Sequence, residues 1–226
     1  MKVVTLASSI IHPDGWDLMH EFGFDPFSND EEVTDADIIG ELAGRNCYES
    51  FGKPNPATAS NKDYLKNTVV DLAHESILEH STVTFYVSGV SRNLLLELER
   101  HRHISFSVIS TRYVSPNKMG MILHPNTPVE LRGDILEHDA AGRKLADRIY
   151  LRAKVAGLDQ KQAREVGRQV LGGNTETKMV VSGNLRAWRY VINLRAHPKA
   201  DAEIQQFAGA LLYELKKVAP NSFQDM

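Results

Sequence analysis

Residues 82–113 read TVTFYVSGVSRNLLLELERHRHISFSVISTRY, and the first part of this stretch carries the clearest strand signal in the chain. Val83, Phe85 and Val87 alternate with Thr and Tyr side chains, which is the period of two expected for a half-buried strand. The Ser-Gly pair at 88–89 is predicted to end the strand.

A helix is predicted directly after this strand. Ser91 can cap it, because a serine hydroxyl accepts a hydrogen bond from a backbone N–H of the first turn. Leu94, Leu95 and Leu98 then recur at a spacing that buries one side of the helix. The helix therefore carries its C-terminal end to the charged segment that begins at Arg100.

Working outward, further periodic segments predict an α+β protein. The expected strands cover 2–8 and 176–182, and the expected helices cover 34–50, 133–156, 159–171, 184–194 and 198–218. Another helix should follow the loop at 51–59, with Tyr64, Leu65, Val69 and Leu72 facing inward. Long helices around one group of strands favour a single domain over 1–226, in which the helices flank a central, mainly antiparallel sheet.

Composition limits the possible partners and the location. The 226 residues carry a net charge of −3, so the molecule as a whole is not expected to be drawn to nucleic acid or to a membrane. Cys47 is the single cysteine, which fits a reducing cytoplasm. The N-terminal apolar run is too short for a signal peptide, and no stretch approaches the roughly 20 apolar residues that cross a bilayer. A cytoplasmic, soluble protein is predicted.

An acidic stretch leaves two interpretations open. Residues 14–41 contain ten Asp or Glu residues and no Lys or Arg. They form either a solvated loop and helix face or an acidic docking surface.

The segment from Arg100 to Tyr113 predicts an anion site. It contains four Arg or His residues in succession, then Ser and Thr residues, a further Arg and no carboxylate. Guanidinium groups match phosphate oxygens as rigid forks, and hydroxyls add short-range donors. Arg100 and Arg102 would also offset the negative end of the preceding helix dipole, but this does not explain the hydroxyls. A phosphorylated small molecule is the expected ligand.

Several familiar chemistries are excluded. The chain has neither a GxGxxG after a strand nor a GxxxxGK[ST], so any nucleotide must be held in another way. His74 and His80 are not spaced as helical zinc ligands, and arginines beside His101 and His103 would repel a dication, so no metal site is predicted. Cys47 is expected to be a small core-facing helix residue and not a nucleophile, because no histidine is close in sequence to activate it.

The cationic segment resembles the signature of the flavin-dependent thymidylate synthases, RHRxxSxxxxSxRY. The seven defined positions are Arg100, His101, Arg102, Ser105, Ser110, Arg112 and Tyr113. Residues 74–80, HESILEH, are similar to the family's H-x-S-x-x-E-H segment. Arg168 in RQVL, Asn184-x-Arg186 and residues 193–195 are also similar to family segments, so the resemblance extends from about Arg45 to the C-terminus.

The resemblance implies the reaction and the cofactors. A homotetramer with active sites at subunit interfaces would convert dUMP to dTMP. It would use 5,10-methylenetetrahydrofolate as carbon donor and NADPH-reduced FAD as hydride source, and it would release tetrahydrofolate.

The resemblance also assigns site residues. Positions that match dUMP contacts are Glu97, Arg100, Val108, Ser110, Arg112, Arg168 and Arg195. Positions that match FAD contacts are Ser76, Arg100, His101, Arg102, Asn184, Arg186 and Arg189. Arg195 matches the catalytic arginine, whose charge favours ionisation of the pyrimidine N3. Ser107, Val108 and Arg189 depart from the residues common in the family, although a backbone contact at Val108 does not depend on its side chain.

Two features refine this expectation. Arg186 and Arg195 lie nine residues and about 180° apart on a helix, so they cannot enter one pocket from a straight helix. Either the helix ends first or they serve different sites of an oligomer, and we favour the second. Cys47 lies outside every motif, so catalysis is expected without an enzyme nucleophile.

Two rival functions come from other classes. An RNA-binding module could use the cationic segment with Phe106 and Tyr113 stacking on bases, although the net negative charge opposes this. A flavoprotein that only oxidises a reduced nicotinamide would share the FAD residues but would not need Arg168 or Arg195.

Overall fold

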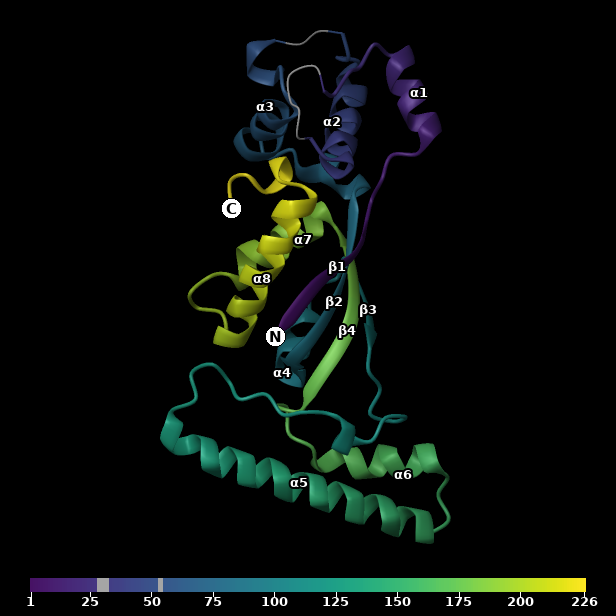
Figure 1. The fold of residues 1–226 in the computed structure, drawn as a ribbon, viewed down its shortest axis with the longest axis vertical. Helices are drawn as coiled ribbons and strands as arrows, with labels where there is room; N and C mark the ends of the chain where they lie inside the picture. Colours follow the sequence, from purple (N-terminus) through teal and green to yellow (C-terminus); the bar gives the residue numbers. More distant parts are fainter. Residues whose placement is uncertain (28–32, 53–54) are drawn as a thin grey trace.

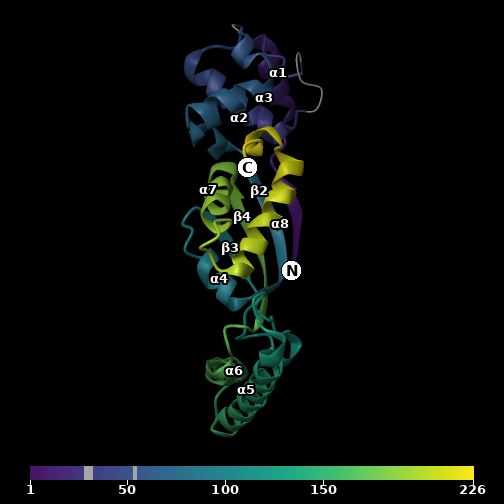
Figure 2. The same cartoon turned by 90° about the vertical axis from the view of Figure 1, so that its left-hand side faces the viewer.

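The computed structural model describes residues 1–27, 33–52 and 55–226. The molecule is elongated, with helices α1 to α3 at one end, the sheet in the middle and the helices α5 and α6 at the other end (Figure 1). Figure 2 shows that α7 and α8 lie side by side over the sheet.

The centre is a four-stranded antiparallel sheet, which confirms the predicted α+β class. It consists of β1 (Lys2–Ser8), β2 (Thr82–Ser91), β3 (Ile104–Val108) and β4 (Glu176–Asn184), in the order β1-β2-β4-β3. Each pair of neighbours is antiparallel.

The predicted end of the second strand at residues 88–89 was wrong. Gly89 adopts a φ of 68°, and the register with β4 shifts between Ser88 and Val90. Glycine accommodates this left-handed conformation without a Cβ clash, so the chain forms a bulge and the strand continues to Ser91.

Eight α-helices are found in the described ranges. They are α1 (Pro13–Glu21), α2 (Asp35–Tyr48), α3 (Asn61–Leu65), α4 (Arg92–Leu98), α5 (Val129–Val155), α6 (Gln160–Gly167), α7 (Leu185–Arg195) and α8 (Ala202–Val218). Shorter 3₁₀ turns cover Pro56–Thr58, Glu75–His80, Pro116–Lys118, Arg168–Val170 and Asn221–Phe223, and a π-helix covers Lys66–Asp71.

The main core fixes α7 against the sheet. Trp188 on α7 is fully buried, packs edge-on against Phe85 at 5.3 Å between ring centroids, and donates from Nε1 to the Val83 carbonyl at 3.2 Å. A Cβ at Gly183 would lie only 3.1 Å from this indole, so the strand is closely fitted to the helix. This contact places the polar residues of α7 at defined positions.

Two predictions about facing were wrong. Leu72 is 54% exposed, because the helical segment that buries Tyr64, Leu65 and Val69 ends at Asp71. Cys47 is exposed, because the buried side of α2 consists of residues such as Ile38 and Gly44 and turns away from Cys47.

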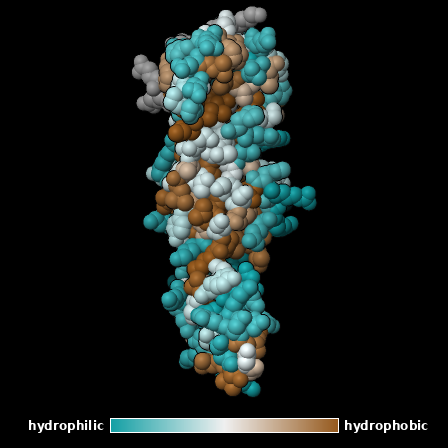
Figure 3. Space-filling view, turned by 90° about the vertical axis from the view of Figure 1, so that its right-hand side faces the viewer, coloured by the Kyte–Doolittle hydropathy of each residue, from teal (hydrophilic) through white to brown (hydrophobic). Residues whose placement is uncertain are grey.

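Helices α5 and α6 form an arm beyond the sheet (Figure 1). Arg143 anchors the arm: its guanidinium donates to the carbonyls of Pro116, Met119 and Gly120 at 2.5 to 2.8 Å and pairs with Asp139 at 2.6 Å. Figure 3 shows hydrophobic atoms on the surface at this end of the molecule. Exposed large apolar residues of α5 are Val129, Leu131, Leu136, Leu151 and Val155.

Across residues 1–27, 33–52 and 55–226, none of the helices combines the length and the apolar character that a bilayer span requires.

Candidate functional site

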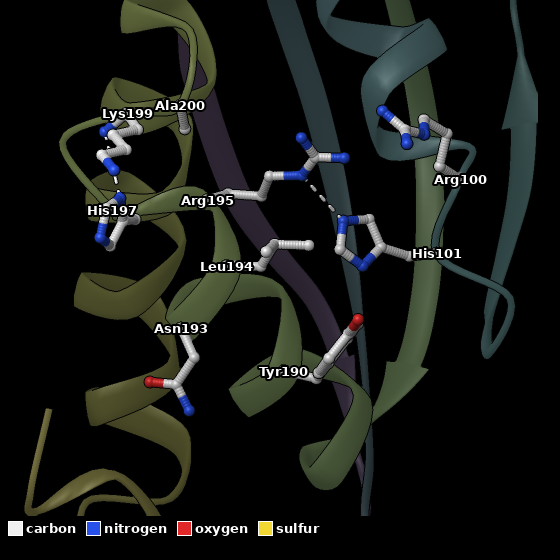
Figure 4. A pocket seen from close by; sticks show the side chains of 9 residues that line it. All are labelled: Arg100, His101, Tyr190, Asn193, Leu194, Arg195, His197, Lys199 and Ala200. Atoms are coloured by element: carbon white, nitrogen blue, oxygen red, sulfur yellow. Dashed lines mark hydrogen bonds between the residues drawn. The ribbon is translucent and has the colours of Figure 1, made fainter.

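Two cavities adjoin each other between α7 and the turn that joins α4 to β3. The first, of about 570 Å³, is lined by Arg100, His101, Tyr190, Asn193, Leu194, Arg195, His197, Lys199 and Ala200 (Figure 4). The second, of about 520 Å³, is lined by Glu75, Glu79, Arg100, His101, Arg102, His103, Ile104, Asn184, Arg186, Ala187 and Tyr190. We call them cavity 1 and cavity 2; Arg100, His101 and Tyr190 line both.

Local sequence places the cationic turn at these cavities. The Ser91 hydroxyl accepts from the Leu94 N–H at 3.0 Å and caps α4, as predicted. The His101 N–H then bonds the Leu98 carbonyl at 3.0 Å, which closes the helix into a turn. Because Leu94 and Leu98 are buried in the core, the turn that follows them is held against α7.

The Arg195 side chain is fixed by three hydrogen bonds. Its Nε donates to His101 Nε2 at 3.0 Å, its Nη1 to Glu97 Oε2 at 2.9 Å, and its Nη2 to the Glu97 carbonyl at 2.7 Å. Figure 4 shows the side chain reaching from the end of α7 toward the His101 ring. The residue is only 8% exposed, so this cation is held in one orientation.

His101 must be neutral in this arrangement. An arginine Nε is a donor and never an acceptor, so His101 Nε2 accepts and the ring proton lies on Nδ1. Burial, followed by the charges of Arg195 and Arg100, lowers the pKa of His101 to about 4. His101 lines both cavities, and within the described ranges its Nδ1 is buried without a hydrogen-bond partner.

This environment predicts a pH dependence of stability. From about pH 6.5 down to about pH 4 the unfolded chain takes up a proton at His101 that the folded chain does not bind, so the contribution of His101 to the free energy of unfolding should fall across this window. The loss should be of the order of 3 kcal/mol and should be absent above the window. Urea unfolding at about pH 7 and pH 4.5, compared with H101Q, measures it. Equal pH dependence in both proteins would contradict the assignment.

Cavity 2 combines cations with carboxylates. Arg186 pairs with Glu79, and its Nε lies 4.0 Å from Glu75 Oε2. Asn184 also lines the cavity, but its Oδ1 accepts from the Ala187 N–H at 2.8 Å and caps α7. The guanidinium groups of Arg100, Arg102 and Arg186 suit a ligand that carries negative charge and hydrogen-bond acceptors.

Arg186 and Arg195 line different cavities of the same chain. The two arginines therefore do not enter one cavity, and the idea that they serve different sites of an oligomer stays a prediction. The alternative that the helix ends before Arg195 was wrong, because α7 runs through it.

Four predicted residues, from Val108 onward, lie in a second cluster at the other end of β3. Arg168 Nη1 donates to the buried Thr111 at 3.2 Å, Arg112 lies 3.8 Å from Glu165, and Ser110 Oγ accepts from the Arg112 N–H at 3.3 Å. Val108 is the last residue of β3. None of the four lines cavity 1 or cavity 2.

Two predicted FAD residues do not line either cavity. Ser76 is exposed on the 3₁₀ turn that begins at Glu75. Arg189 is 3% exposed and is bound inside the protein by Asp225, the Ser222 carbonyl and Glu75.

Tyr190 lines both cavities and was missed by the sequence reasoning. Its ring meets the His101 ring edge-on at 5.6 Å between centroids. The available signal was its place four residues after Arg186, which puts both on one face of α7.

Comparison with known proteins gives a consistent result. The family model described as "Thymidylate synthase complementing protein" matches residues 31–221. A probable flavin-dependent thymidylate synthase of Mycobacterium phage D29 is 46% identical, over 100% of this chain and 96% of that protein. A flavin-dependent thymidylate synthase of Mycobacterium tuberculosis (strain ATCC 25177 / H37Ra) is 42% identical, over 85% of this chain and 82% of that protein.

A solved structure agrees in fold. ThyX from Helicobacter pylori, crystallised with FAD and dUMP, superposes with a TM-score of 0.72 at 20% identity, covering 100% of this chain and 98% of that one. The resemblance found in the cationic segment is thus confirmed over most of the sequence. The chain belongs to the family of flavin-dependent thymidylate synthases.

Proposed function

We propose that the chain converts dUMP to dTMP, with 5,10-methylenetetrahydrofolate as carbon donor and NADPH-reduced FAD as hydride source, and that it releases tetrahydrofolate. As a member of its family it is a methyl-transferring enzyme. The observation that carries the finer proposal is the buried Arg195 guanidinium, held by Glu97 and neutral His101 at the wall of cavity 1.

The residues of cavity 2 fit FAD. The cations of Arg100, Arg102 and Arg186 suit its pyrophosphate, and the buried Nδ1–H of His101 is a donor that lacks an acceptor among the described residues. FAD, when bound and reduced, supplies a hydride that no amino-acid side chain can supply. The chain's own contribution is then to bind, orient and polarise.

Arg195 is suited to polarise the pyrimidine. Three of the five N–H groups of a guanidinium are used for Glu97 and His101, which leaves two for a substrate. A fixed cation beside the ring favours loss of the N3 proton and stabilises the negative charge that develops. Since the orientation is set before the substrate binds, little reorganisation is needed.

We assign the phosphate of dUMP to the second cluster, which contains Ser110, Arg112 and Arg168. A neighbouring subunit would supply this cluster. Arg112, Arg168 and Ser110 supply two guanidinium groups and a hydroxyl, which suit a phosphate. In one chain they do not line the cavities that hold Arg195 and Arg100, so a homotetramer with interface sites would reconcile the two groups. The exposed apolar residues of α5 support association through the neighbouring arm.

A cofactor-omission assay tests the proposal. Formation of dTMP from dUMP should require FAD, NADPH and 5,10-methylenetetrahydrofolate together, and tetrahydrofolate should be the folate product. Formation of dihydrofolate would contradict the scheme. Consumption of NADPH without dTMP would favour the simple oxidase, and absence of a flavin band near 450 nm would leave the RNA-binding rival.

Removal of the only thiol should leave catalysis intact. Cys47 is exposed on α2 and lines neither cavity. For C47A we expect a kcat for dTMP formation within about twofold of wild type, because surface substitutions away from the site have small effects. Loss of dTMP formation in a variant that still binds FAD would show that a cysteine nucleophile is used.

A further inference from the structure

We propose that Asp225 is a positioning residue for cavity 2, acting through Arg189 and Glu75; this inference rests on the proposed function. Asp225 lies beyond the residues that match the family model and close to the C-terminus. It touches neither cavity, yet it binds Arg189, a buried cation of α7 that also contacts Glu75 in the wall of cavity 2.

The pair formed by Arg189 and Asp225 is bidentate. Nη1 and Nη2 of Arg189 each donate to one oxygen of Asp225, at 2.8 Å, and Nη1 also donates to the Ser222 carbonyl at 2.6 Å. The Arg189 guanidinium, through its hydrogen bonds, lowers the pKa of Asp225, so the carboxylate stays charged. This leaves the Arg189 Nε for Glu75, which accepts at 3.2 Å.

Glu75 connects the pair to the cavity. Its Oε1 is bound by Arg189 while its Oε2 lies 4.0 Å from Nε of Arg186, and both Glu75 and Arg186 line cavity 2. The Arg186 guanidinium therefore pairs with Glu79 and also lies within ion-pair distance of Glu75. Because Asp225 occupies both Nη groups of Arg189, Glu75 accepts a hydrogen bond only from the Nε of Arg189.

The C-terminal segment is itself well anchored. The buried carboxylate of Asp37 accepts from the Asn221 N–H at 3.0 Å and from the Ser222 N–H at 2.9 Å. Gln224 Nε2 donates to the Lys62 carbonyl at 3.0 Å. Asp225 is thus held by the packing of α2 and α3, so it presents its carboxylate to α7 in a fixed place.

Loss of the Asp225 charge should change the ion pairs of Arg186, although Asp225 itself does not line cavity 2. In D225N the buried Arg189 would turn its fork to Glu75, because a desolvated cation strongly favours a carboxylate. Glu79 would then be the remaining ion-pair partner of Arg186, and FAD binding would have to order the Arg186 side chain. We expect the dissociation constant for FAD to rise about threefold to tenfold, the range for ordering one long side chain.

The test measures FAD affinity of the flavin-free full chain by quenching of flavin fluorescence, together with thermal unfolding before FAD is added. E214Q is the matched control, since Glu214 also pairs with a cation, Lys217, but has no contact with Arg189 or Glu75. D225N should weaken FAD binding, and E214Q should not. D225E, which keeps the charge, should recover part of the affinity.

Measuring D225N in a second variant, E75Q, distinguishes a positioning role of Asp225 from a general effect on protein stability. In E75Q the further change D225N should alter the FAD dissociation constant by less than about 1.5-fold, because the connecting carboxylate is already gone. The inference is overturned if D225N binds FAD as wild type does, binds it more tightly, or loses the same factor in both backgrounds. If D225N does not fold, R189K, which keeps the cation but loses the fork, is measured against the same criteria. If wild type itself does not bind FAD, the proposed function fails, which is a different outcome.

Discussion

Replacing Arg195 with lysine should lower kcat for dTMP formation by about 10²- to 10³-fold, the loss typical for removal of one preorganised donor to a developing negative charge. Lysine keeps the charge but cannot bind Glu97 and His101 and also present two further N–H groups in a plane. The three hydrogen bonds that orient Arg195 would therefore be lost. Steady-state kinetics with varied dUMP at saturating cofactors would measure the effect.

The matched control is R152K on the exposed surface of α5, where the same substitution should leave kcat within about twofold. FAD content, read from the flavin absorbance, should remain near wild type in R195K. A kcat for R195K within about tenfold of wild type would contradict the role given to the guanidinium geometry.

Mixing two impaired variants should restore activity at dUMP concentrations near the wild-type KM. R195K is defective at cavity 1, and R168A should be defective in binding the dUMP phosphate, with KM for dUMP raised by about 10²-fold because charge-assisted hydrogen bonds are lost. If one subunit supplies Arg195 and its neighbour supplies Arg168, subunits mixed in equal amounts form about a quarter of their sites from two intact contributions. The mixture should then show about a quarter of wild-type activity.

Co-expression of the two variants with different affinity tags, followed by purification over both tags, yields the mixed oligomers. The double variant R168A/R195K mixed with wild type is the control for exchange and dilution. If the mixed oligomers of the single variants stay as inactive as each parent, both arginines act within one chain and the interface site is wrong.

Much of the fold could be predicted from residue periodicity. The strand at 2–8 and the helix capped by Ser91 were predicted correctly because their signals are local. The strand β3 was missed although Ile104, Phe106 and Val108 alternate with serines, because the same residues belong to the cationic motif and were interpreted only as a ligand site. The bulge at Gly89 was missed because a glycine that ends a strand and one that bends it look the same in sequence.

The site was less predictable than the fold. Local spacing was enough to predict that Arg186 and Arg195 do not enter one cavity, but it could not show that Arg189 turns inward. That orientation depends on Asp225, which is 36 residues away in the chain and outside every motif. The separation of Arg168 from Arg195 likewise depends on the tertiary position of the arm, which no local pattern encodes.

The long helix α5 has a consequence for how the molecule opens. It is 27 residues long, yet Ala146 and Ala153 are its only buried residues. Within one chain little apolar contact holds it, so in a dissociated subunit a fluctuation that melts or lifts it need not disturb the sheet. Backbone amides of α5 should therefore exchange with solvent through low-energy partial opening, whereas those of β2 and β4 exchange only when the whole chain unfolds.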